Sequence, residues 1–182
     1  RHVEAYKRLL EKFGVAYPMT PPLKELIDQT LRDSRWDMTY LGMQVVIEGL
    51  ALAAFGTIRD MAQNNLCQQV NAYVMQDESR HVSFGRLALR DYYPHLTDKE
   101  RREREEFLVE ACYLMRDRFD AVEVWKNLGL PIDECAEALY GSGMMANFRN
   151  ILFSRIVPIV RDIGLWGDVA RAGYEKMGVI GF

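Results

Sequence analysis

The sequence predicts an all-α protein that folds as a helical bundle, and three observations lead to this prediction. Apolar residues recur at spacings of three and four along most of the chain, which is typical of helices with one buried face. The alternation of β-branched and polar residues that marks strands is absent from the sequence. Glycine and proline stand between the helical segments. The length of 182 residues suits a single domain, residues 1–182, and no low-complexity linker divides it.

Four helices are expected in the first half of the chain. Gly14 ends the first of them, and the loop YPMTPP, with Thr20 and its prolines, suits the start of the second. The third and fourth are long and are separated by the polar corner AQNNLCQQ. The expected ranges are residues 1–12, 23–32, 36–62 and 66–92.

Further helices are expected in the second half, residues 97–182. The segment YYPHLTDKE is a break, with Thr97 as helix N-cap and Glu100 three residues later completing a capping box. A charged amphipathic helix then runs to about Lys126 and ends at NLGLP. The tail from Ile132 is helical, with expected interruptions at Gly141–Gly143, Pro158 and Gly164–Gly167.

Composition excludes several classes of partner. The net charge is −3 and no basic block is present, which argues against nucleic acid or an anionic membrane as the main partner. The three cysteines are far apart and form no CxxC pair, a usage that suits a reducing, cytoplasmic compartment. No signal peptide is visible, and the longest apolar run, residues 45–58, is interrupted by Glu48 and too short to span a bilayer. No membrane span is therefore expected.

Glu48 is the first candidate for chemistry, because its segment MQVVIEGLALAAF is apolar almost all round. Its helical neighbours include no Lys or Arg that could pair with it. They are Gln44, Val45, Ala51 and Leu52. A buried carboxylate without a partner is costly and is kept only when something neutralises it. The alternative is a protonated or distantly paired core glutamate.

Glu78 and His81 form an ExxH pair on the fourth predicted helix. Residues three apart project from the same face of a helix, so both side chains can reach one ligand. The pair alone is a weak signal, since many such pairs are solvated on the surface. Apolar flanking residues favour a largely core-facing helix; they are Val74, Met75, Val82, Phe84 and Leu87.

The spacing of these residues predicts that they converge. Glu48 and Glu78 are thirty residues apart, with the polar corner midway near Gln63. In an antiparallel hairpin each acid then lies about 15 residues, or ~22 Å, from the turn, at one level of the bundle. His2 shares the Arg-His-Val signature of residues 80–82, and its own acid would fall two residues before Arg1. We therefore expect the chain to be N-terminally incomplete, with a Glu two residues upstream of Arg1.

These motifs resemble the ferritin-like di-iron carboxylate proteins, in particular their oxygen-activating branch. That branch includes ribonucleotide reductase small subunits, the ligand-binding oxidases related to them, acyl-carrier-protein desaturases and arylamine N-oxygenases. The family pattern is a Glu or Asp on one helix and ExxH on the next, followed by a second Glu and a second ExxH. Glu48 and DESRH match the second half, and Arg1-His2 matches part of the first. The resemblance implies a ferritin-like bundle whose metal-binding core is residues 1–92, with residues 97–182 as accessory helices.

The resemblance also implies a site that holds two iron ions, or one manganese and one iron. His2 and His81 would each bind one metal, Glu78 would bridge the two, and Glu48 would bridge or bind terminally. Asp77 is placed like the outer aspartate that accepts the N–H of the opposite histidine, here His2. Its alternative is an exposed aspartate that pairs with Arg80.

Tyr6 follows His2 by one helical turn on the same face. This position resembles that of the radical tyrosine in ribonucleotide reductase small subunits and implies a redox role, with an ordinary core tyrosine as the alternative. The chain departs from two subfamilies, because Met43 replaces the cross-linking tyrosine of the ligand-binding oxidases and Val74 replaces the additional histidine of the arylamine N-oxygenases.

The surroundings of the site bear on its substrate. Small residues leave room for a ligand, or else permit close helix packing; they are Gly49, Ala51, Ala53, Ala54 and Gly85. Expected apolar walls are Met43, Leu50, Phe55 and Phe84.

The predicted function is an O2-dependent oxidase or oxygenase that acts on a small or apolar organic substrate, with an external electron donor. The large helical faces also favour a homodimer. Two alternatives are a ferritin-type protein that oxidises and stores iron, and a helical binding module without metal.

Overall fold

The computed structural model describes residues 1–14, 19–120 and 122–179, and within these ranges the secondary structure is helical, with no strand. This confirms the predicted all-α class. The elements of the first half are α1 (His2–Glu11), α2 (Pro21–Arg32), α3 (Trp36–Tyr40), η1 (Leu41–Ile47), α4 (Glu48–Met61) and α5 (Asn65–Tyr92). Those of the second half are η2 (Tyr93–His95), α6 (Asp98–Arg118), α7 (Val122–Asn127), α8 (Ile132–Gly141), α9 (Met144–Asp162) and α10 (Asp168–Met177).

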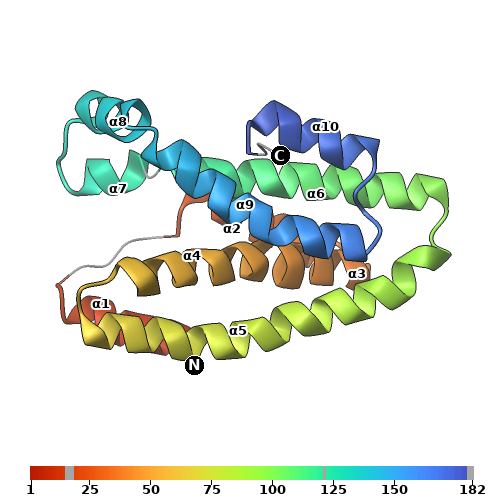
Figure 1. Ribbon diagram of the computed structural model, residues 1–182, viewed down its shortest axis with the longest axis horizontal. Helices are drawn as coiled ribbons and strands as arrows, with labels where there is room; N and C mark the ends of the chain where they lie inside the picture. Colours follow the sequence, from red (N-terminus) through yellow and green to blue (C-terminus); the bar gives the residue numbers. More distant parts are fainter. Residues whose placement is uncertain (15–18, 121, 180–182) are drawn as a thin grey trace.

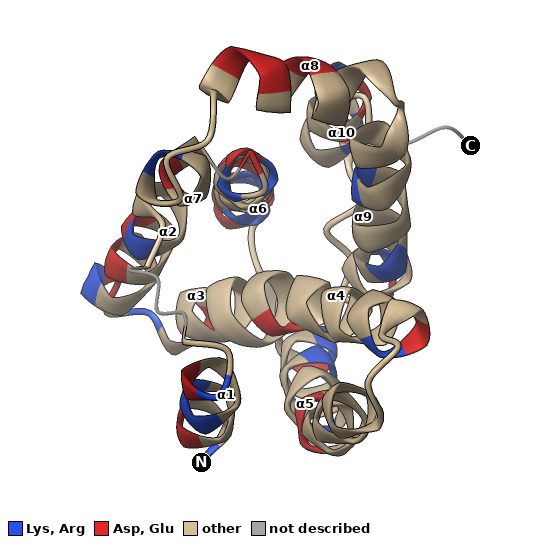
Figure 2. Cartoon of the chain, turned by 90° about the vertical axis from the view of Figure 1, so that its left-hand side faces the viewer, with Lys and Arg blue, Asp and Glu red and all other residues tan. Residues whose placement is uncertain are grey.

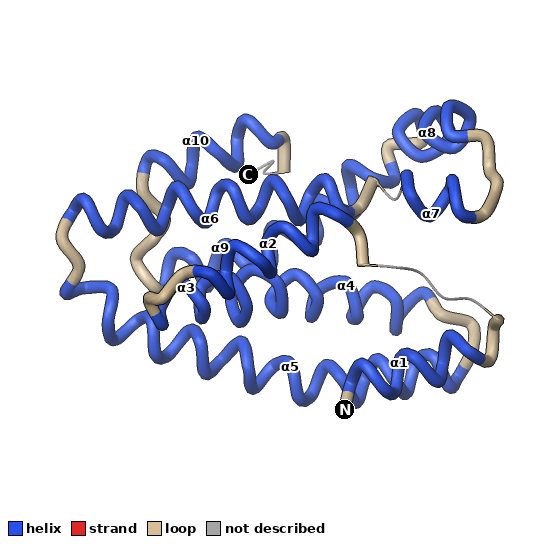
Figure 3. The backbone as a smooth tube through the Cα atoms, turned by 180° about the vertical axis from the view of Figure 1, so that it is seen from behind, coloured by secondary structure: helices blue, strands red, loops and turns tan. Residues whose placement is uncertain are grey.

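The helices α4 and α5 form the antiparallel hairpin that the sequence predicts, and α1 lies along α5 (Figure 1). Seen end-on, α6 is enclosed by α2, α10 and the layer formed by η1 and α4, while α9 crosses α4 (Figure 2). The short helices α7 and α8 stand together at one end of the molecule (Figure 3). The α1–α5 pair therefore covers only one side of α4.

The core lies between the η1–α4 layer and the C-terminal helices. Side chains that are fully or almost fully removed from solvent come from both halves of the chain; they include Leu41, Val45, Leu50, Leu89, Leu108, Met115, Phe153, Ile156 and Tyr174. Their burial is the main favourable term in the stability of such a bundle. This core holds η1 and α4 in place.

Polar groups determine where several helices begin. The Thr97 hydroxyl accepts a hydrogen bond from the Glu100 backbone N–H, and the Glu100 carboxylate accepts one from the Thr97 N–H, so the predicted capping box is present. The Asn64 side chain accepts hydrogen bonds from the backbone N–H groups of Leu66 and Cys67 at the start of α5. These contacts fix the turns on either side of the long α5 helix.

Two predicted boundaries were wrong. The charged helix was expected to run to Lys126, but α6 ends at Arg118, because the Phe119 backbone N–H turns back to the carbonyls of Arg116 and Asp117. Pro158 was expected to interrupt the last part of the chain, but α9 continues through it. The proline ring lies on the solvent face while Val157 and Val160 beside it are buried, and this burial offsets the roughly 3 kcal/mol that an internal proline costs.

The predicted helix 36–62 is continuous but not uniform, because η1 within it is a π-helix of 7 residues. The whole helix, Trp36–Met61, has 26 residues and is long and apolar enough to cross a membrane by length and composition alone. Core helices of soluble proteins meet the same criterion, and 33% of its most apolar window is buried here. The expectation that no membrane span is present stays a prediction.

Candidate metal centre

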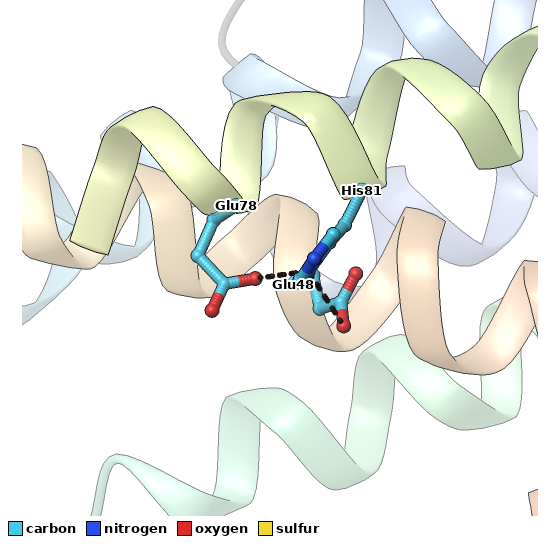
Figure 4. Close-up of side chains that lie close together, drawn as sticks. All are labelled: Glu48, Glu78 and His81. Atoms are coloured by element: carbon cyan, nitrogen blue, oxygen red, sulfur yellow. Dashed lines mark hydrogen bonds and ion pairs between the residues drawn. The ribbon is translucent and has the colours of Figure 1, made fainter. Parts of the chain in front are cut away.

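Three predicted side chains meet between α4 and α5. Glu48, Glu78 and His81 each offer one ligand atom, and these atoms all lie within 4.8 Å of one another. The Nδ1 atom of His81 is 3.2 Å from Glu78 Oε2 and 3.6 Å from Glu48 Oε1 (Figure 4). Glu78 is 8% exposed, whereas half of the His81 side chain is exposed. The group therefore has a buried floor and an opening to solvent on the His81 side.

His2 reaches the same group from α1. Its Nδ1 atom lies 2.7 Å from Glu78 Oε1, and the rings of His2 and His81 have centroids 6.3 Å apart. The Glu78 carboxylate thus turns one oxygen to each histidine. The structure brings together all four of the residues predicted as metal ligands.

Asp77 contacts both of the partners considered for it. Its Oδ2 atom lies 3.0 Å from His2 Nε2, and its Oδ1 atom accepts a hydrogen bond of 3.0 Å from Arg80 Nη1. Arg1 also donates to Oδ2, at 2.8 Å. The hydrogen bond with His2, followed by that with Arg1, lowers the pKa of Asp77 below its ordinary value. Asp77 is therefore held as an anion against the outer nitrogen of His2.

Glu48 has the least compensated carboxylate of the group. Burial, followed by the negative charge of Glu78, raises its pKa, while the two histidines act in the opposite direction. Its Oε2 atom is buried and has no hydrogen-bond partner among the described residues. A buried oxygen of this kind is satisfied when a cation binds, because the cation replaces the missing positive charge.

The packing of η1 against α5 determines where Glu48 lies. Gly85 allows this close approach, since a Cβ atom at position 85 would overlap Cβ of Gln44. Gly42 makes a similar approach to the Thr30 side chain of α2. Glu48 follows directly as the first residue of α4, and its backbone N–H still bonds to the Met43 carbonyl five residues earlier. Short π-helical segments occur often beside functional sites.

Tyr6 lies one turn from His2 but makes its own contacts. Its hydroxyl donates a hydrogen bond of 2.8 Å to Asn71 Oδ1, and its ring stacks on Phe55 with centroids 5.4 Å apart. Burial is the main cause that raises the pKa of Tyr6 to about 12. These contacts do not test the predicted redox role of Tyr6. They do place Phe55, which was predicted as an apolar wall of the site, against the Tyr6 ring.

Two polar residues near the site were not predicted as part of it. Asn71 is buried on the same face of α5 as Glu78, two turns earlier, and this spacing was a usable signal. Gln44 was considered only as a helical neighbour of Glu48, and its carboxamide oxygen is also buried without a partner among the described residues. An amide has no signature spacing, so no sequence pattern points to Gln44.

The predicted small residues divide between two roles. Gly85 packs against Gln44, as the close-packing alternative requires. Gly49 also packs closely, because a Cβ atom there would lie 2.9 Å from Ile156 Cγ2. Gly49 and Ala53 in addition line a groove of about 810 Å³ beside α4, whose other apolar lining residues include Leu52, Met75, Val82 and Ile159. Of the predicted apolar walls, Leu50 is wholly buried in the core and Phe84 is largely exposed. The groove lies along the helices that carry the ligands.

Comparison of this chain with family models, curated proteins and solved structures finds no match. The chemistry of the site is therefore argued from its own donor atoms. Carboxylate oxygens and imidazole nitrogens together suit iron and manganese, whereas thiolate ligands, which soft metals prefer, are absent from the group.

Proposed function

We propose that this protein is an oxygen-activating di-metal carboxylate protein with a ferritin-like core. The observation that carries the proposal is the placement of Glu78, whose two oxygens face histidines from two different helices. A carboxylate in this position can bridge two cations, each with one imidazole ligand. The uncompensated Oε2 atom of Glu48 supports the same conclusion, because a polar atom is rarely buried without a partner.

The residues that would hold the metals are His2, Glu48, Glu78 and His81, and the ions would be two iron ions or one manganese and one iron. When bound, such a pair supplies the reduction of O2 and the oxidation of an organic substrate.

The surrounding side chains prepare His2 as a ligand. Asp77 is held as an anion by Arg1 and Arg80, so it can accept the Nε2–H of His2 while Nδ1 faces Glu78. Loss of the proton from Nδ1 would then free that nitrogen to bind a cation. An outer carboxylate of this kind fixes the ring and makes its free nitrogen more basic. Because the pKa of Glu48 is raised, protons compete with the cation for this carboxylate, so metal binding should become weaker in acid.

The opening at His81 suits the entry of a small organic substrate. The groove on the same helix hairpin has apolar lining residues that suit an apolar substrate, but it is lined by none of the four ligand residues. A ferritin-type protein that oxidises Fe(II) for storage is the alternative within the same chemistry. Oxygen uptake that depends on an organic substrate would support the oxygenase, whereas uptake in proportion to added Fe(II) would support storage. If the intact protein binds no metal, the third alternative would be supported, namely a helical binding module without metal.

The decisive experiment measures metal content in the intact protein after reconstitution with Fe(II) under anaerobic conditions. Glu78→Ala is expected to abolish loading, because it removes the group shared by both histidines, while the helical circular dichroism spectrum is retained. Glu106→Gln is the control, since Glu106 is an exposed carboxylate on α6 whose ion pair within the described part of the chain is with Arg102. Full loading of Glu78→Ala would contradict the proposal.

A further inference from the structure

Gln44 lies in the interface between η1 and α5. Its Cβ and Cγ atoms occupy the space that a side chain at position 85 would need, so Gly85 is required there. Gln44 therefore points toward α5 and not toward the core beneath η1.

The antiparallel pairing of the two helices places Gln44 beside the metal centre. Glu48 faces His81 across the interface, and Gln44 faces Gly85. Gln44 lies four residues before Glu48 on the Trp36–Met61 helix, and Gly85 lies four residues after His81 on α5. Both distances are about one helical turn. Gln44 is thus in the next layer of side chains after the contact between Glu48 and His81.

Two oxygen atoms in these adjacent layers lack a partner. Oε1 of Gln44 and Oε2 of Glu48 are both buried and accept no hydrogen bond from any described residue. While Glu48 is ionised both atoms are acceptors, so in that state they cannot satisfy each other and each needs an electropositive partner. Buried polar atoms without a partner are exceptions that call for an explanation.

We propose that Gln44 is a further oxygen donor of the metal centre, which contacts the cation directly or through one water held beside Glu48. This inference rests on the proposed function, because it requires that a cation binds at Glu48, Glu78 and His81. An amide oxygen is a hard, neutral ligand, which adds a contact to the cation without adding negative charge to a site that already holds two carboxylates.

The test uses Co(II), whose visible absorption reports the number and kind of its ligands, titrated into the intact protein. Gln44→Leu is expected to weaken cobalt affinity by about 10- to 100-fold and to change the absorption spectrum. The same variant should unfold at an equal or higher temperature when metal-free, because leucine has a similar volume and removes a buried amide without a partner. A merely structural role would instead lower the unfolding temperature.

A second pair of variants adds a negative charge at two contrasting positions. Gln44→Glu is expected to tighten cobalt binding by about tenfold, because a carboxylate replaces the amide beside the cation. Gln76→Glu adds the same charge on the exposed face of α5, two residues before Glu78, where solvent screens it. That control should change cobalt affinity by less than about twofold.

The outcomes separate this inference from the proposed function. Two results would exclude Gln44 from the site, provided that Glu78→Ala still loses the metal. One is wild-type cobalt affinity in Gln44→Leu, and the other is an equal change in cobalt affinity in Gln44→Glu and Gln76→Glu. If the wild-type protein binds no cobalt or iron, the proposed function fails and this inference fails with it.

Discussion

Two polar clusters inside this bundle have opposite character. Arg104 of α6 and Asp37 of α3 form a closed ion pair of 2.9 Å in which the two side chains are only 3% and 2% exposed. The candidate metal centre gathers Glu48, Glu78 and His81 around an opening, and one carboxylate oxygen there has no partner among the described residues. The first cluster balances its charge within the protein, whereas the second leaves an imbalance that a cation would correct. Burial of charged groups alone therefore does not mark a functional site. The informative feature is a buried carboxylate oxygen without a partner that belongs to a cluster of acids and a histidine.

The largest effect on stability is expected when the closed pair is broken. Asp37→Ala removes the buried carboxylate of Arg104 and leaves its guanidinium only the longer 3.5 Å contact with the partly exposed Glu103. This loss should cost about 3–5 kcal/mol in the free energy of unfolding. Urea denaturation followed by circular dichroism measures the loss. Asp91→Ala is the control, because Asp91 forms an exposed pair with Arg90, and its removal should cost less than about 1 kcal/mol. Similar costs for both variants would contradict the contrast drawn here.

An intermediate effect is expected at the contact that positions Glu48. Gly85→Ala places a methyl group against Gln44 and should push η1 from α5, at a cost of about 1–3 kcal/mol. Metal affinity should fall as well, since Glu48 follows η1 directly. Gly56→Ala is the matched control in the same helix hairpin, because its Cβ would lie 3.4 Å from Met75 Cε, an ordinary contact. That variant should be neutral or gain up to about 1 kcal/mol from helix propensity.

The smallest effect on the stability of the protein is expected from the titration of Glu48. Burial raises its folded-state pKa, so the folded protein holds this proton more tightly than the unfolded chain does. This contribution to stability is complete below the unfolded pKa of about 4.3 and is lost as pH rises through the folded pKa. The metal-free protein should therefore lose stability relative to Glu48→Gln as pH increases, and the two should converge in acid.

Thermal unfolding of both proteins in a chelator, measured across this pH range, checks the sign. Parallel curves would mean that Glu48 has no raised pKa. With Fe(II) present the order should reverse near neutral pH, because the carboxylate binds the metal and the amide binds it less well.

Much of the fold was predictable because helical periodicity is a local property of the sequence. The hairpin and the meeting of Glu48 with Glu78 followed from the spacing of the two acids about the polar corner, and His2 followed from the repeated Arg-His-Val signature. These predictions needed only the rise of a helix and one turn. The sequence also anticipated the capping box at Thr97.

The remaining features depend on tertiary contacts that the sequence pattern does not contain. The π-helix η1 forms where Gly42 and Gly85 let two neighbouring helices approach, and neither glycine differs in the sequence from one that permits ordinary packing. Pro158 remains inside α9 because residues beside it are buried in the core. Gln44 could not be chosen from the sequence, since only the packed interface shows that its oxygen has no partner.

The way in which α1 is attached to α5 means that a cation bound at the candidate site would stabilise the docking of this whole helix. Of its ten residues only Leu9 is buried, and its links to α5 are largely polar, through His2 and Tyr6. A ligand that binds only the assembled form stabilises that form by mass action, so cation uptake should tighten this helix against the hairpin. Chelation would then loosen α1 first, and a protease that cleaves near Arg8 would report the change before the rest of the bundle unfolds.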